Sequence, residues 1–244
     1  MNTTPAPQPA LPLFYTQVRP LDRVQDADLR IRRGADLRFT ATTNAIPLVG
    51  EEFPFAASDY PIVFSPAPTP VPVAVVGLER DKNLMVDAAG QWMRRSYIPA
   101  YVRRYPFILV EDPDNQKLVL CYEENAPHLS PQGELPMFEN GEPSETVKLA
   151  LDFCMALREQ GTATDAFVQA LQAQELLQPA NVEVMAGGGA KVHMDGFLTI
   201  DRQRFMALPA AVIADWHKRQ WLDLVYAHFI SGLRWQTLAD IASA

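Results

Sequence analysis

Short apolar runs bounded by turn residues predict strands in the first part of the chain. Each run is rich in β-branched or aromatic residues and ends at Pro, Gly, Asp or Asn. The predicted strands are Ile62–Phe64, Val71–Leu78, Leu84–Val86, Phe107–Val110 and Leu118–Tyr122. Turn residues at 79–83 and 112–115 predict two hairpins, which we expect in one antiparallel sheet. Because proline lacks a backbone donor, the proline-rich stretch Ser65–Pro72 predicts an exposed loop or an edge.

From residue 144 the apolar positions follow a helical period. Ser144 is a suitable N-cap, and the residues that share one helical face are Val147, Ala150, Leu151, Cys154 and Leu157. We expect Gly161 to end this helix, and a second helix to begin near Thr164 or Asp165 and stop before Pro179. The expected outcome is an αα-hairpin.

The last third of the chain predicts a hairpin followed by short helices. Alternating residues on both sides of Gly187–Gly189 predict a hairpin with a flexible tip, and no helix or Gly-Lys-Ser/Thr follows to make a phosphate loop. Asp201 is a suitable N-cap for a helix to Met206, and Pro209 begins a helix through His217. A final helix covers 221–242, with Gly232 as a kink or a break.

These elements predict the α+β class: an antiparallel strand-rich N-terminal part packed with a helical C-terminal part in a single domain. We expect residues 1–12 to form a disordered proline-rich tail. The domain then covers 13–244, strand-rich over 13–143 and mainly helical over 144–244.

Composition narrows the class of function. The chain has 244 residues with 21 Lys plus Arg against 29 Asp plus Glu, a formal net charge of −8 that disfavours nucleic-acid binding. No apolar run is long enough for a membrane span, and the N-terminus resembles no secretory signal, so we expect a cytoplasmic protein. Cys121 and Cys154 lie within apolar runs and predict reduced, buried thiols.

The residues that carry chemistry form no recognised catalytic or metal motif. His193, Asp195 and His228 superficially mimic a two-His-one-carboxylate iron site, but His228 falls in a predicted helix instead of a barrel strand. We therefore expect no metal, no cofactor and no catalytic set. The adjacent acid pairs Glu51–Glu52 and Glu123–Glu124 are interpreted as solvated.

The segment Trp92–Pro106 concentrates four arginines and three tyrosines. Pro99 suits a helix start and Pro106 its end, which would place Tyr101 and Tyr105 one turn apart on one face. Guanidinium forks bind carboxylate or phosphate, so the segment is a candidate site for a ligand or partner. The alternative, which we favour, is that these arginines pair internally with acids between 111 and 145.

This segment also carries a family resemblance. The residues Tyr97–Leu109 resemble the signature of the SapC family, and further blocks agree in the same order: Thr43–Val49 with Glu52–Phe53, Tyr60–Phe64, Gly196–Asp201 and Tyr226–His228. The resemblance covers about Phe14 to Leu238. Asp195 and the segment Ser231–Trp235 depart from the family pattern.

The resemblance implies a bacterial protein whose family name derives from surface-layer protein export. Its relatives often occur beside tryptophan-halogenase-like and TonB-dependent uptake genes, and it implies no established catalytic residue. We therefore expect a non-enzymatic accessory protein that binds an unknown protein partner or small ligand, linked to surface-layer export or envelope nutrient handling. The candidate binding residues are Asn44, Tyr97, Tyr101, Arg103, Arg104, Tyr105, Tyr226 and His228.

Two alternatives stay open. One is an enzyme acting alongside a halogenase or oxygenase, with Tyr226, His228 or Asp195 as acid–base groups. The other is a structural oligomer subunit anchored by Trp216, Trp221 and Trp235, although tryptophans at this density are more often core.

Overall fold

Residues 11–34, 36–66, 69–112 and 116–243 are described by a computed structural model. Their contacts divide the chain into two compact units, unit 1 from residues 1–34 and 105–151 and unit 2 from residues 35–104 and 152–244. The α+β class is confirmed, with sheets mainly from the N-terminal part and helices from the C-terminal part. The expected tail at 1–12 lies, apart from residues 11 and 12, outside the described residues.

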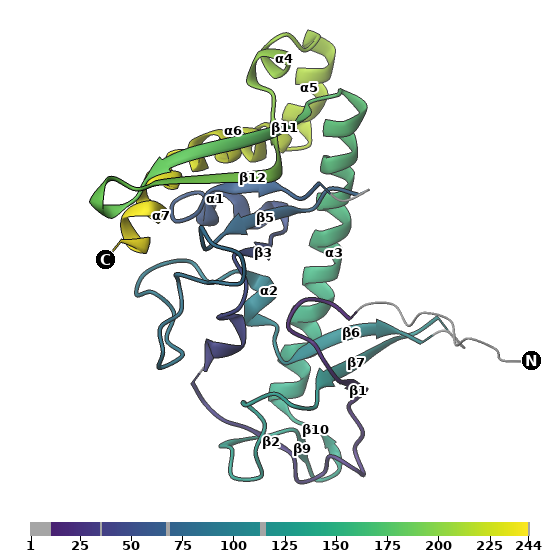
Figure 1. The fold of residues 1–244 in the computed structure, drawn as a ribbon. Coiled ribbons are helices and arrows are strands. Elements are labelled where there is room, and N and C mark those ends of the chain that lie inside the picture. The colour runs from purple at the N-terminus through teal and green to yellow at the C-terminus, as the bar shows by residue number, and fades with distance from the viewer. Residues whose placement is uncertain (1–10, 35, 67–68, 113–115, 244) are drawn as a thin grey trace, which may run out of the picture. The chain divides into compact units, whose positions relative to one another are not determined.

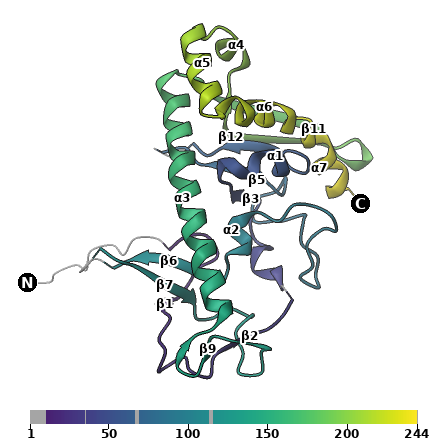
Figure 2. The same cartoon turned by 180° about the vertical axis from the view of Figure 1, so that it is seen from behind.

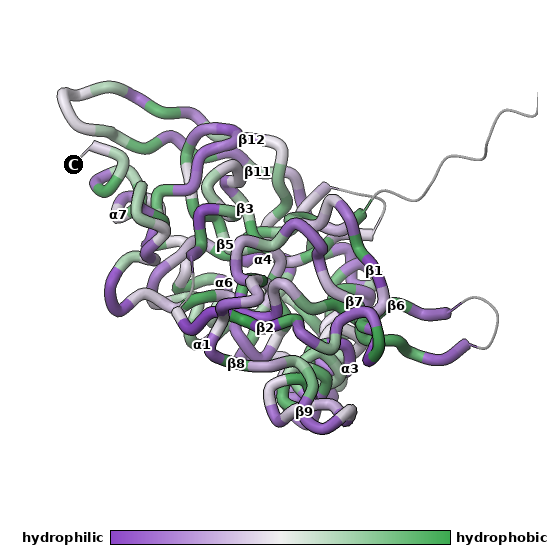
Figure 3. The backbone as a smooth tube through the Cα atoms, turned by 90° about the horizontal axis from the view of Figure 1, so that it is seen from below, coloured by the Kyte–Doolittle hydropathy of each residue, from purple (hydrophilic) through white to green (hydrophobic). Residues whose placement is uncertain are grey.

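Unit 1 is built from short antiparallel strands. β1 (Val18–Pro20), β7 (Leu118–Glu123) and β6 (Phe107–Glu111) form a sheet in the order β1-β7-β6. Two further pairs join β2 (Arg30–Ile31) to β8 (Leu135–Pro136), and β9 (Phe138–Glu139) to β10 (Glu142–Pro143). Toward the loop that joins β6 to β7, apolar residues give way to hydrophilic ones (Figure 3). The sheet's core is Tyr15, Ile108 and Cys121.

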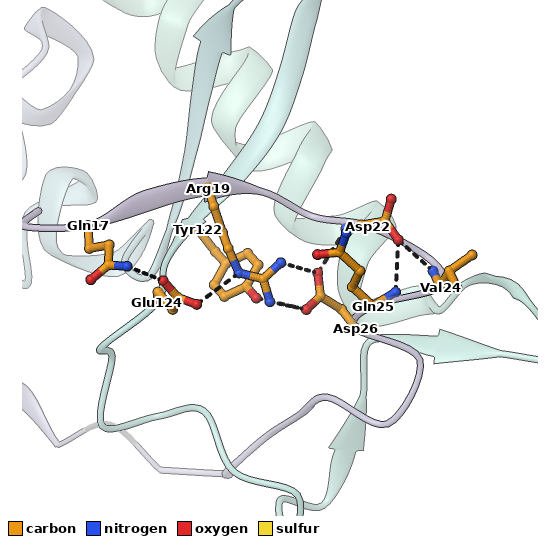
Figure 4. Close-up of polar contacts among 8 residues, drawn as sticks. All are labelled: Gln17, Arg19, Asp22, Val24, Gln25, Asp26, Tyr122 and Glu124. Atoms are coloured by element: carbon orange, nitrogen blue, oxygen red, sulfur yellow. Dashed lines mark hydrogen bonds and ion pairs between the residues drawn. The ribbon is translucent and has the colours of Figure 1, made fainter.

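A buried carboxylate organises the polar interior of unit 1. Asp26 is only 3% exposed and accepts hydrogen bonds from the guanidinium of Arg19, the backbone N–H of Asp22 (2.8 Å) and the hydroxyl of Tyr122 (2.9 Å) (Figure 4). A buried charge is tolerated only where such partners replace water. The network therefore fixes the loop after β1 against β7.

Unit 2 contains a five-stranded antiparallel sheet. Its order is β11-β12-β4-β5-β3, from β11 (Leu177–Met185), β12 (Lys191–Ile200), β4 (Ile62–Phe64), β5 (Pro72–Val75) and β3 (Ala45–Pro47). The predicted hairpin at Gly187–Gly189 is confirmed as the β11–β12 connection, which contains the 3₁₀ turn η3 (Gly187–Gly189). Pro72 begins an interior strand, which it can do because a first residue need not donate to the ladder.

Unit 2 also contains helices, some of which pack against this sheet. The short ones are η1 (Leu37–Thr40), η2 (Gly50–Glu52), α1 (Phe53–Ala56) and α2 (Ala100–Arg103). The later ones are α4 (Arg202–Met206), α5 (Ala210–Lys218), α6 (Trp221–Ser231) and α7 (Arg234–Ala242). They confirm the Asp201 cap and the break at Gly232, whereas Pro209 lies at the N-cap of α5 and not at its first helical position. α6 packs against β4 and β12, α1 and α5 pack against α6, and α7 packs against β11 (Figure 1). No helix within the described ranges is both long and apolar enough to cross a membrane.

Aromatic residues fill the interior between these helices. Phe167 lies 6.3 Å from Trp216 and 5.9 Å from Trp221, measured between ring centroids, and Trp235 stacks on Phe197 at 5.5 Å. Trp216 is 3% exposed. Each of the three C-terminal tryptophans thus packs against other aromatic rings of unit 2.

The predicted αα-hairpin is wrong. α3 (Glu145–Ala173) is one helix of 29 residues that runs through Gly161 (Figure 2). Cys154, Leu157, Thr164, Val168 and Leu171 are buried at spacings of three, seven, four and three, so one buried stripe continues past the glycine. Glycine disfavours a helix interior by only about 1 kcal/mol, which side-chain burial along α3 outweighs.

The expectation that two hairpins share one sheet is also wrong. β6 and β7 belong to the sheet of unit 1, whereas β5 lies in the sheet of unit 2. Leu84–Val86 forms no strand; it follows a turn in which Leu84 N–H donates to the carbonyl of Val76 (2.9 Å). Local turn signals predicted the reversals correctly but carried no information on which strands pair.

The uninterrupted α3 makes a testable prediction. Gly161→Ala should raise the free energy of unfolding by about 1 kcal/mol, because no atom outside the local helix lies within 4 Å of the added Cβ and alanine favours a helix. Urea unfolding followed by circular dichroism measures this.

Gly188→Ala at the hairpin tip is the control. Its φ of +73° strains an L-residue, so that variant should lose about 1 kcal/mol although its space is equally open. A loss of stability in Gly161→Ala would mean that the chain turns at Gly161.

Candidate functional site

A cleft in unit 2 brings together several residues of the Trp92–Pro106 segment and the start of α1. Its volume is about 250 Å³. We call it the Glu52 cleft, and its lining residues are Glu51, Glu52, Phe55, Tyr97, Ala100, Arg103, Phe153, Ala156, Leu157 and Gln160. This volume lies just below the range of pockets for drug-sized ligands, so it suits a single side chain or a small ligand.

The Glu52 carboxylate joins two segments of the chain, its own around Val49 and the one that contains Tyr97 and Ala100. One oxygen accepts from the backbone N–H of Val49 (2.9 Å), and the other accepts from the backbone N–H of Ala100 (2.6 Å) and the hydroxyl of Tyr97 (3.0 Å). Glu52 is 4% exposed. These bonds hold η2 and α1 against the start of α2.

Burial is the largest influence on the pKa values of Glu52 and Tyr97. Burial raises the pKa of Glu52, opposed by the bonds from Ala100, Val49 and Tyr97 and by the charge of Arg103. Burial, followed by the neighbouring Glu52 charge, raises the pKa of Tyr97 to about 12. The Tyr97 hydroxyl therefore stays protonated at neutral pH and can donate to Glu52.

The backbone of Tyr97 is held on both sides. Its N–H donates to Asp59 (2.7 Å), and its carbonyl accepts from the hydroxyl of Tyr60, which in turn accepts from the indole of Trp92 (3.0 Å). The ring of Phe55 stacks on the ring of Tyr97, with centroids 5.7 Å apart. Tyr97 thus forms a wall whose position is fixed before any ligand arrives.

Arg103 lies at the edge of the Glu52 cleft. Its guanidinium donates to the carbonyl of Ile98 (3.0 Å) and the hydroxyl of Tyr97 (3.0 Å), and lies 5.6 Å from the Tyr97 ring centroid and 5.2 Å from that of Phe153. The side chain is exposed. A guanidinium has five N–H groups, so it retains donors beyond these two bonds.

The other candidates of this segment lie elsewhere. Arg104 stacks on Tyr101, with its guanidinium carbon 4.0 Å from the ring centroid, and the Nε of Arg104 is buried. The predicted shared face of Tyr101 and Tyr105 is wrong, because α2 ends at Arg103 and Tyr105 packs against Tyr15 and His128 in unit 1. The pairing of these arginines with acids between 111 and 145 stays a prediction.

Two acidic residues were assigned wrongly from the sequence. Glu52 and Glu123 are 4% and 1% exposed instead of solvated, while Glu51 and Glu124 beside them are exposed. Adjacent residues point apart, so one member of each pair turns inward. In the sequence, the only indication that Glu52 and Glu123 are the buried residues is the large aromatic neighbour of each, Phe53 and Tyr122.

Asn44 and Tyr226 do not line the Glu52 cleft. Asn44 is half-buried, and its carbonyl accepts from the N–H of Val76 (2.8 Å) beside β3. Tyr226 is 46% exposed on α6 and contacts Phe205 and Phe229 edge-on. Phe55 and Phe153, which line the cleft, were not predicted, because no local motif marks them.

His228 is buried and bonded to backbone at both ring nitrogens. Nε2 accepts a hydrogen bond from the backbone N–H of Ile200 (3.1 Å), so Nε2 has a free lone pair and carries no proton. The ring proton is therefore on Nδ1, which donates to the carbonyl of Ile62 (2.9 Å). The imidazole is therefore neutral. It joins α6 to β4 and β12, and burial lowers its pKa to about 4.

The three residues that mimic an iron site do not form one. His193 and Asp195 are exposed and lie 3.6 Å apart on β12, whereas His228 is buried and fully bonded. Within the described ranges, no three His, Cys, Asp or Glu side chains gather to hold a metal. Cys121 and Cys154 are free and buried, as predicted.

Comparison with known proteins gives a match to a family model. The family model described as SapC matches residues 21–238, nearly the whole chain. No curated protein and no solved structure matches.

The neutral His228 predicts a pH dependence of stability. The pKa of His228 is about 4 in the folded state and about 6.5 in an unfolded chain, so protons bind the unfolded chain first. The contribution of His228 should be complete above pH 6.5 and fall by up to about 1.4 kcal/mol per pH unit toward pH 4. Urea unfolding between pH 4 and 8 measures this slope.

Two histidine variants separate this effect from other titrations. His228→Gln should flatten the slope between pH 6.5 and 4, whereas His193→Gln, at an exposed position, should keep it. An unchanged slope in His228→Gln would contradict the assignment.

Proposed function

The chain belongs to the SapC family, and from this membership and the Glu52 cleft we propose that it is an accessory protein that binds instead of catalysing. The observation that carries the proposal is Arg103, an exposed guanidinium held between aromatic rings at the edge of a preformed cleft. Aromatic contacts and the bonds to Ile98 and Tyr97 restrict its rotamers, which lowers the entropy lost on binding.

The chemistry of the cleft favours an occupant with two parts. Arg103 offers charge-assisted donors to a carboxylate or another acceptor. Phe55 and Phe153 offer apolar contact, and Phe55 is 61% exposed. We infer that a partner's side chain or a small ligand presents an acceptor beside an apolar group.

The proposed link to export or to nutrient handling rests on the family alone. We propose that the protein acts in the cytoplasm, in connection with surface-layer protein export or envelope nutrient handling. The family's name supports the first setting, and the resemblance drawn from the sequence supports the second.

The proposed acid–base residues give less support to an enzyme. Both nitrogens of His228 are bonded to backbone, and Asp195 is exposed beside His193 on β12 and does not line the Glu52 cleft. Glu52 already accepts three hydrogen bonds, which suits a structural carboxylate better than a proton donor.

The proposal predicts a loss of binding in Arg103→Ala. The tagged chain, purified from cells that express it naturally, should retain a specific protein or small ligand, and Arg103→Ala should reduce that occupancy at least tenfold. The melting temperature should change little because the side chain is exposed. Quantitative mass spectrometry of co-purified proteins and native mass spectrometry of the eluate measure both kinds of occupant.

Arg202→Ala is the matched control. Arg202 is also exposed and lies over an aromatic ring, 5.0 Å from the centroid of Phe229, but does not line the cleft. It should retain the occupant. Equal occupancy in all three proteins would contradict the proposal, and a bound metal or cofactor without a partner would favour the enzyme.

A further inference from the structure

A second hollow in unit 2 lies on the other side of α1. Its volume is about 600 Å³, within the range of ligand-binding pockets. We call it the α1–α6 hollow, and its lining residues are Pro54, Ala57, Ser58, Asp223, Tyr226, Ala227, Ile230 and Arg234. None of them lines the Glu52 cleft, so an occupant here is independent of the proposed function.

α1 and the turn that follows it separate the two hollows. Pro54 of α1 and Ala57 and Ser58 in that turn line the α1–α6 hollow. Phe55 points the other way and stacks on Tyr97 in the Glu52 cleft. One short helix thus supplies a wall to each hollow.

Small side chains open the space between α1 and α6. Ala57 and Ala227 are buried at the floor, 5% and 8% exposed, where larger residues would fill the gap. Tyr226 and Ile230 remain 46% and 57% exposed beside them. The hollow therefore presents apolar surface to solvent, which favours an occupant with an apolar body.

Arg234 supplies a cation at the α7 end of the hollow. Its Nε is buried and has no hydrogen-bond partner, and its guanidinium forms no ion pair with any residue of the described ranges. A buried donor without an acceptor is costly. α7 also begins at Arg234 with no acidic residue in its first turn, so its positive end favours an anion.

We propose that the α1–α6 hollow binds a small amphiphilic carboxylate. The carboxylate accepts from the Arg234 guanidinium, whose planar fork matches two oxygens, and the apolar tail lies over Ala57, Ala227 and Ile230. Asp223, in the first turn of α6, also lines the hollow, and the chain's net charge is −8. Both disfavour a multiply charged head such as a phosphate monoester.

Decanoate is the probe, used with the full chain below its micelle-forming concentration, and decanamide is its uncharged counterpart. Isothermal titration calorimetry should show saturable decanoate binding and at least tenfold weaker binding of decanamide. Arg234→Gln should weaken decanoate binding at least tenfold and leave decanamide binding unchanged.

Further variants keep the test decisive if Arg234→Gln does not fold. Ile230→Asp places a like charge in the apolar wall and should weaken decanoate binding, whereas Met206→Asp, at another exposed apolar position outside the hollow, should not. Arg103→Ala should bind decanoate as the unmodified chain does.

Three results would overturn the inference. They are the absence of saturable decanoate binding, equal affinity for decanoate and decanamide, and loss of decanoate binding in Arg103→Ala but not in Arg234→Gln. The last result would assign the anion to the Glu52 cleft and leave the proposed function standing.

Discussion

The architecture around both hollows depends on the buried carboxylate of Glu52. Its three hydrogen bonds hold the segment around Val49 to the segment of Tyr97 and Ala100, which is more than forty residues away in sequence. α1 begins at the next residue, so the same carboxylate sets the helix that forms one wall of each hollow. A desolvated carboxylate without these donors would cost several kcal/mol, which makes the arrangement specific.

His228 acts in a comparable way at the centre of the sheet of unit 2. β12 pairs with β4 at Leu198 and Phe64, and continuing that antiparallel register would place Ile200 opposite Ile62. The imidazole instead lies between the N–H of Ile200 and the carbonyl of Ile62 and bonds to both. Ser231, one turn later on α6, accepts from the N–H of Ile62 (2.9 Å). Two side chains of α6 thus replace ladder bonds and hold the helix against the sheet.

A residue type with catalytic potential is therefore often structural in this protein. His228 and Glu52 satisfy backbone donors and acceptors that water cannot reach. Arg103 and Arg234 differ from them, because each adjoins a hollow and keeps donors beyond the bonds it makes. The number of hydrogen-bonding groups left without a partner therefore distinguishes the structural residues His228 and Glu52 from the candidate binding residues Arg103 and Arg234.

Local signals in the sequence predicted most elements. β4, β6 and β7, the β11–β12 hairpin, and the caps at Ser144 and Asp201 follow from β-branched runs, turn glycines and short polar side chains. The predicted helix end at Gly161 was wrong because a glycine ends a helix only where the buried apolar face also ends. In α3 that face continues beyond Gly161. Tyr97 and Arg103 were identified as candidates by the unusual density of arginine and tyrosine around them.

The sequence by itself determined the α+β class, the family, the buried thiols and the segment that carries Arg103, because each of these depends on neighbours within a few residues or on a motif. The tertiary structure alone decided which hairpin joins which sheet, which of two adjacent glutamates is buried, and which aromatic rings surround Arg103. These outcomes depend on contacts such as Arg103 with Phe153 or Glu52 with Ala100, which lie about fifty residues apart. Local propensity carries no information on such pairings, because the free energy that selects them is gained only when the whole core is desolvated together.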